Sequence, residues 1–104
     1  MSDDLYQCAQ CQRPLAKEDL VASMSGSILG DECSECYYLC PVCQVYTKVT
    51  WWETFCGPET GSRSDPIPKE EGDRRVGLIR QCSEPWDKKC RCAAHRAYFG
   101  DSLD

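Results

Sequence analysis

The sequence predicts a small metal-stabilised α+β domain, and three observations lead to this fold class. The chain has 104 residues with only three Trp, two Phe and two Met, so it can bury only a modest apolar core. Ten residues are cysteine, and six of them stand in three Cys-x-x-Cys pairs. Residues 44–55 are rich in β-branched and aromatic types, which is typical of a strand.

The remaining elements follow in chain order. Between the first two cysteine pairs, residues 12–32 predict short strands or a hairpin, because apolar anchors alternate there with turn residues. Residues 74–81 predict a second strand, which would pair with 44–55 as an antiparallel β-hairpin. Residues 57–73 are polar and rich in proline, so we expect a mobile loop at the tip of that hairpin.

A short C-terminal helix is predicted over residues 93–99, where alanines favour a helix and Gly100 can end it. Residues 101–104 form an acidic tail. We expect an N-terminal zinc-knuckle unit over 1–39 and a second metal-binding unit over 40–100, packed together as one domain.

The expected compartment decides how the cysteines are interpreted. The chain contains no run of about 18 apolar residues, and Met1–Asp4 is acidic without a following apolar stretch. We therefore expect an intracellular protein, cytoplasmic or nuclear, without a membrane segment. Clustered cysteines in a reducing compartment hold metal more often than they form disulfides. The predicted cofactor is Zn²⁺, with two ions as the first expectation and three as the alternative.

Ten residues are the candidate metal ligands. They are Cys8, Cys11, Cys33, Cys36, Cys40, Cys43, Cys82, Cys90, Cys92 and His95. A Cys-x-x-Cys turn suits zinc because two thiolates at this spacing can reach one ion. His95 has a second interpretation, as an exposed helix residue, and Cys56 is either a buried cysteine or a ligand of a third site.

Two pairings of these ligands are open. In a sequential arrangement, Cys8 and Cys11 share an ion with Cys33 and Cys36, and the third pair joins the C-terminal cluster. In a cross-brace, Cys8 and Cys11 share an ion with Cys40 and Cys43, while Cys33 and Cys36 reach the C-terminal cluster. The sequential form is favoured, because a hairpin starting after Cys43 would return Cys82 beside it.

The cysteine spacing resembles known zinc modules. Cys8-x2-Cys11-x21-Cys33-x2-Cys36-x3-Cys40-x2-Cys43 is similar to the opening of a LIM, PHD or FYVE domain. Cys40-Pro-Val-Cys43, followed by a hairpin and a ligand pair that opens a helix, resembles a zinc ribbon or treble-clef finger. The resemblance implies a zinc-ribbon or treble-clef unit over 40–100, with metal in a structural role.

The predicted function is a non-enzymatic, zinc-binding interaction module. The expected interaction surface consists of Trp51, Trp52, Arg74, Arg75, Arg80, Lys88, Lys89 and Arg91. A protein partner is the first expectation because the net charge is −5, which disfavours nucleic acid. Two alternatives stay open: a nucleic-acid-binding finger that uses the basic segment 74–96, and an iron–sulfur or thiol redox protein. The sequence offers no paired catalytic carboxylates, Ser–His–Asp set or phosphate-binding loop.

Overall fold

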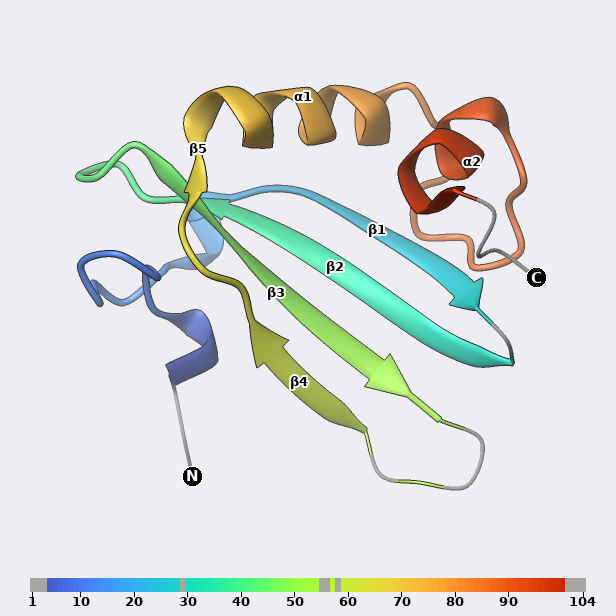
Figure 1. The fold of residues 1–104 in the computed structure, drawn as a ribbon, viewed down its shortest axis with the longest axis horizontal. Helices are drawn as coiled ribbons and strands as arrows, with labels where there is room; N and C mark the ends of the chain where they lie inside the picture. Colours follow the sequence, from blue (N-terminus) through green and yellow to red (C-terminus); the bar gives the residue numbers. More distant parts are fainter. Residues whose placement is uncertain (1–3, 29, 55–56, 58, 101–104) are drawn as a thin grey trace.

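The computed structural model describes residues 4–28, 30–54, 57 and 59–100. It shows an antiparallel sheet with two helices (Figure 1), which confirms the predicted α+β class. The strands are β1 (Leu20–Ile28), β2 (Asp31–Leu39), β3 (Val45–Glu53), β4 (Thr60–Arg63) and β5 (Ile67–Pro68). The helices are α1 (Lys69–Arg80) and α2 (Ala93–Phe99), with short 3₁₀ turns at Asp4–Tyr6 and Lys17–Asp19.

The sheet has the strand order β1-β2-β3-β4, and β5 pairs with the beginning of β3. The predicted strand over 44–55 is confirmed as β3, the central strand, which pairs with three others. The hairpin expected within 12–32 lies further along the chain, as β1 and β2, with Gly30 at φ +86° in its turn. The helix predicted over 93–99 is confirmed as α2, and Gly100 follows it with φ +70°.

The predicted strand over 74–81 is wrong, because residues 69–80 form helix α1. Gly72, Val76 and Ile79 are the buried residues of this helix, and their spacing places them on one helical face. Acidic residues in the first turn suit the positive end of the helix dipole, and Glu71 pairs with arginines three and four positions on. These ion pairs within one helix stabilise α1, although the apolar residues at 76–79 are also typical of a strand.

The predicted mobile loop over 57–73 is also wrong where the structure describes it. Residues 60–63 form β4 on the edge of the sheet, residues 67–68 form β5, and α1 begins at Lys69. The expected hairpin between 44–55 and 74–81 is therefore replaced by the β3–β4 pair, with Trp51 opposite Gly61.

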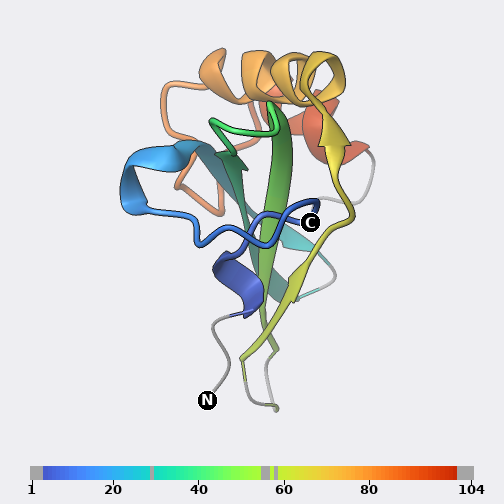
Figure 2. The same cartoon turned by 90° about the vertical axis from the view of Figure 1, so that its left-hand side faces the viewer.

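Helix α1 crosses the direction of the strands (Figures 1 and 2) and packs on the sheet face that carries Met24, Tyr37 and Tyr46. The buried core lies between this face and the two helices. Its members are Met24, Tyr37, Tyr46, Ile67, Val76, Ile79, Cys82 and Ala94. This core is small and includes Cys82, so the packed region and a candidate metal cluster share a residue.

Helix α1 comes very close to the sheet at Gly72, which lies against the ring of Tyr46. A Cβ atom at Gly72 would stand 2.0 Å from Cδ2 of Tyr46. The ring cannot move easily, because Tyr46 is 2 % exposed and its hydroxyl donates a hydrogen bond of 2.7 Å to Asp73. Only glycine allows the helix to approach the strand this closely.

Two glycine substitutions on α1 are expected to act in opposite directions. Gly72→Ala should lower the free energy of unfolding by about 1–3 kcal/mol, because overpacking outweighs the gain in helix propensity. Gly77→Ala, whose Cβ would meet nothing within 4 Å, should raise it by up to about 1 kcal/mol. Urea unfolding of both metal-loaded variants measures the difference. Equal effects of the two substitutions would contradict this packing.

Two candidate metal centres

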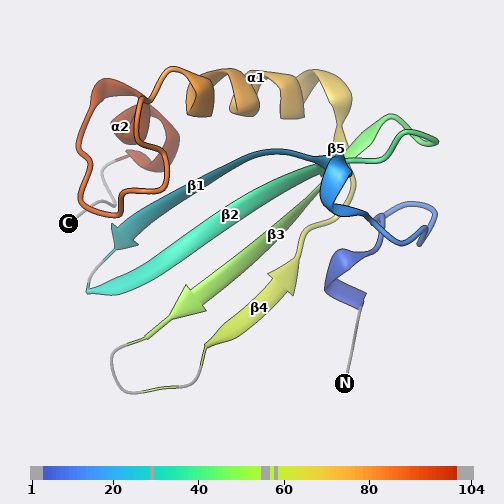
Figure 3. The ribbon, with the colours of Figure 1, turned by 180° about the vertical axis from the view of Figure 1, so that it is seen from behind.

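The first candidate centre is formed by Cys8, Cys11, Cys40 and Cys43, whose sulfur atoms all lie within 4.8 Å of one another. The first pair lies in the N-terminal segment, and the second lies in the loop between β2 and β3. Figure 3 shows these two segments close together at one end of the sheet. Cys8 and Cys40 are fully buried, whereas Cys11 is exposed, so the centre has one inner and one outer side.

The two Cys-x-x-Cys turns have the same backbone geometry. In each turn, the first cysteine donates its N–H to the carbonyl five residues on, namely Arg13 for Cys8 (2.8 Å) and Val45 for Cys40 (3.0 Å). The same cysteine accepts, on its carbonyl oxygen, the N–H of the residue four positions on, at 2.9 Å in both turns.

The residue after the second cysteine has the same backbone conformation in both turns. Gln12 and Gln44 have φ values of +62° and +58°, the left-handed conformation that closes each turn. Backbone N–H groups also point at the inner sulfurs, from Gln10 to Cys8 (3.4 Å) and from Cys43 to Cys40 (3.5 Å). Such donors stabilise a thiolate, which is the form that binds metal.

The sulfur positions fit a single tetrahedral ion. With metal–sulfur bonds of about 2.3 Å, tetrahedral geometry places neighbouring sulfurs about 3.8 Å apart. The sulfurs of Cys11 and Cys40, which come from different turns, are 3.9 Å apart. The turn is anchored to the sheet as well, because Ala9 N–H donates to the buried hydroxyl of Thr47 on β3 at 2.9 Å.

The second candidate centre is formed by Cys82, Cys90, Cys92 and His95. Cys82 follows the end of α1, Cys92 caps the N-terminus of α2, and His95 lies in the first turn of α2. The sulfurs of Cys82 and Cys90 are 3.7 Å apart. Nδ1 of His95 lies 3.2 Å from the sulfur of Cys82 and 3.6 Å from that of Cys92. These separations are also close to those around one tetrahedral ion.

The imidazole of His95 is fully buried and is oriented by the sheet. Its Nε2 lies 2.9 Å from the carbonyl oxygen of Ser25 on β1, which can only accept a hydrogen bond. Nε2 therefore carries the proton, and Nδ1 presents its lone pair to the three sulfurs. A ligating histidine typically donates its second N–H to a carbonyl or carboxylate in this way. The interpretation of His95 as an exposed helix residue is wrong.

The environment of each thiol sets its pKa. The backbone N–H of His95 donates to the sulfur of Cys92 and lowers the pKa of this thiol. Burial raises the pKa of Cys82 to about 11, and hydrogen bonding with Cys11, together with burial, raises that of Cys43 to about 12. Crowded thiols cannot all ionise together without a cation between them, so both clusters are arranged to receive positive charge.

Cys33 and Cys36 belong to neither group of ligands. Both lie in β2, where residues three positions apart point to opposite faces and are separated by about 10 Å along the strand. The first centre therefore has the cross-brace pairing of Cys8 and Cys11 with Cys40 and Cys43, whereas the second follows neither arrangement. Cys56 lies outside the described residues.

The predicted interaction residues are dispersed over different elements. Trp51 and Trp52 are adjacent on β3, so they face opposite sides of the sheet, and Trp51 donates its indole N–H to Tyr6. Arg74 and Arg75 both pair with Glu71, and Lys88 pairs with Glu32 and Glu53. Arg80 and Lys89 are exposed, on α1 and on the loop before α2, and Arg91 donates to two backbone carbonyls of that loop.

Comparison with known protein families, curated proteins and solved structures found no match. Within the described ranges, neither α1 nor α2 is long and apolar enough to cross a membrane.

Proposed function

We propose that the protein is a non-enzymatic zinc module, in which two Zn²⁺ ions hold a rigid surface for a protein partner. The observation that carries this proposal is the pair of four-ligand groups, each with donor atoms within 4.8 Å of one another. Four protein ligands satisfy a tetrahedral zinc ion and leave no open position for water or substrate. This closed coordination supports a structural role rather than a catalytic one.

Zinc is the metal that the ligands suit best. Thiolates with one imidazole are typical of structural zinc sites. An iron–sulfur cluster contains several metal atoms and needs its cysteines spread around a larger body, whereas these sulfurs converge on one point. Cysteines remain available as ligands only where they are kept reduced, so we place this function in a reducing compartment.

A protein partner is supported by the charge and by the exposed side chains of the metal-bound loops. Two zinc centres of this composition would bring the formal net charge from −5 to about −8, which opposes binding to phosphate backbones. Val42, between the ligands of the first centre, is 71 % exposed, and Trp86, in the loop of the second, is 67 % exposed. Of these two residues, Trp86 is of a type that is enriched at protein–protein interfaces.

Zinc stoichiometry of matched cysteine variants tests the proposal. The wild-type protein, purified without added metal, should contain about two zinc ions per chain, and Cys40→Ser or Cys82→Ser should reduce this to about one. Cys33→Ser and Cys36→Ser are the controls and should retain both ions, although they belong to an identical Cys-x-x-Cys pair. Zinc loss from the control variants would contradict the assignment of ligands, and iron with visible absorbance would contradict zinc.

The second candidate function is nucleic-acid binding through the basic residues of segment 74–96. It is favoured only by the exposed cations of this segment, such as Arg80 and Lys89. Retention of single-stranded RNA that weakens steeply between 50 and 200 mM salt would support it. Absence of such retention by the zinc-loaded protein would leave the protein partner as the proposed function.

A further inference from the structure

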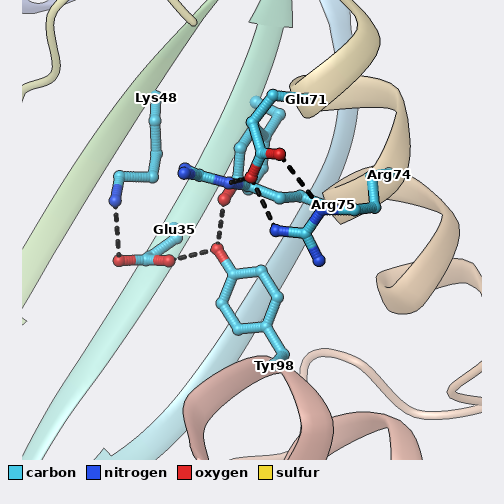
Figure 4. Close-up of polar contacts among 7 residues, drawn as sticks. Glu35, Lys48, Glu71, Arg74, Arg75 and Tyr98 are labelled. Atoms are coloured by element: carbon cyan, nitrogen blue, oxygen red, sulfur yellow. Dashed lines mark hydrogen bonds and ion pairs between the residues drawn. The ribbon is translucent and has the colours of Figure 1, made fainter.

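A pocket of about 390 Å³ lies between the sheet and both helices, and none of the candidate metal ligands lines it. Figure 4 shows the polar side chains around it, which come from β2, β3, α1 and α2. The residues that line it are Glu35, Tyr37, Lys48, Arg74, Arg75, Leu78, Ala97, Tyr98 and Phe99. Its size is within the range of small-molecule sites.

The lining of the pocket is positively charged, although the chain as a whole is acidic. It contains three cations, Lys48, Arg74 and Arg75, and one carboxylate, Glu35. Nζ of Lys48 lies 3.4 Å from Glu35, and both side chains are largely buried. Glu71, beside the lining, pairs with both arginines, so the region carries one more positive than negative charge. In a chain of net charge −5, this local surplus attracts anions.

The carboxylate of Glu35 is already occupied by its neighbours. The hydroxyl of Tyr98 donates to Glu35, and the hydroxyl of the fully buried Tyr37 contacts that of Tyr98 (Figure 4). Burial and the charge of Glu35 raise the pKa of Tyr98, so this phenol stays neutral and keeps its donor proton. The carboxylate of Glu35 therefore already has hydrogen-bond and ion-pair partners within the protein. The class of ligand that the pocket attracts is determined by its cations.

Arg74 and Arg75 already bind one carboxylate, that of Glu71. Glu71, from the same helix, accepts two hydrogen bonds from Arg74, at 3.1 and 2.6 Å, and one from Nε of Arg75 at 2.7 Å. The side chain of Arg75 extends from α1 across the sheet, on the same side as Lys48 (Figure 4). Guanidinium groups match carboxylate and phosphate oxygens in this paired geometry.

The lining also includes apolar side chains, namely Leu78 from α1 and Ala97 and Phe99 from α2. We propose that the pocket binds a small organic anion, in which a carboxylate or phosphate meets Arg74, Arg75 and Lys48 while an apolar ring contacts Phe99. None of the candidate metal ligands lines this pocket, although Phe99 stacks on His95 of the second centre, and the site goes beyond the proposed function. Glu71 competes with the ligand for the arginines, so it limits the affinity of the pocket.

Phenyl phosphate, titrated into the zinc-loaded protein by calorimetry, is the probe. Arg75→Gln should weaken its binding by about 10–100-fold, the effect of losing a hydrogen bond between charged groups. Glu71→Gln should tighten binding several-fold, because it releases both arginines. Arg80→Gln, an exposed arginine on the same helix that does not line the pocket, is the matched control and should bind as the wild type does.

The direction of the Glu71→Gln effect separates a binding role from a structural one, since loss of an ion pair that only supports the fold would not raise affinity. Arg74→Gln replaces Arg75→Gln if the latter does not fold. Inorganic phosphate and benzyl alcohol, which each carry one half of the probe, should bind more weakly than phenyl phosphate. Equal binding of phenyl phosphate by wild type, Arg75→Gln and Glu71→Gln, or its failure to bind the wild type, would overturn the proposal.

Discussion

Removal of zinc by a strong chelator is expected to unfold most of the protein. The first centre joins segments far apart in the chain, since it connects Cys8 to Cys40. The second connects the end of α1 to α2, and the hydrogen bond from His95 to Ser25 ties it to β1. A structural zinc ion contributes about 10–16 kcal/mol of apparent binding free energy at pH 7. The free energy of unfolding of whole domains is only about 5–15 kcal/mol. The binding free energy lost with two zinc ions is therefore larger than the stability of the whole domain.

Circular dichroism with increasing chelator, under reducing conditions, measures this result. Loss of the near-ultraviolet signal of the aromatic core should follow zinc release, and added zinc, but not magnesium, should restore it. The ligands bind metal only when deprotonated, so acidification should release zinc and unfold the chain together. A metal-free, reduced protein with an unchanged spectrum and melting temperature would contradict metal-dependent folding.

The parts of the fold that could be predicted from the sequence are those with a strong local pattern. Strand β3 is rich in β-branched and aromatic residues, and α2 combines alanines with a glycine that follows its last residue. Neither element depends on distant contacts for its recognition. Helix α1 was not predictable in this way, because two of its twelve residues are glycine, and one of these is required by the ring of Tyr46 rather than by the helix.

The candidate ligands could be identified from residue type and spacing, but their grouping could not. Cys8-Ala-Gln-Cys11 and Cys33-Ser-Glu-Cys36 have the same spacing, yet only the first forms a turn. Cys33 and Cys36 are in a nine-residue strand that pairs on both sides, and this pairing overrides the local preference of the motif. Sheet topology therefore determines which cysteine pairs come together at one site. This topology depends on strand pairing between distant segments, which the local sequence around each cysteine pair does not reveal.

Replacement of His95 is expected to have the second largest effect. His95→Ala removes one ligand and leaves a cavity beside Phe99, whose ring stacks on the imidazole at a centroid distance of 6.1 Å. The second centre should lose its zinc at concentrations that saturate the first, and the free energy of unfolding should fall by at least about 3 kcal/mol. Zinc competition with a chelating indicator and urea unfolding give the two values.

His95→Cys separates the role of the ligand from that of the hydrogen bond to Ser25. It keeps four donors, so the chain should still hold two ions, but it loses the Nε2 donor that ties α2 to β1 at 2.9 Å. Loss of such an orienting contact typically weakens metal binding by about 10–100-fold. If His95→Cys binds zinc as tightly as the wild type, the contact with β1 does not orient the ligand. If His95→Ala keeps both ions at wild-type affinity, His95 is not a ligand, and the second centre is a site of three cysteines.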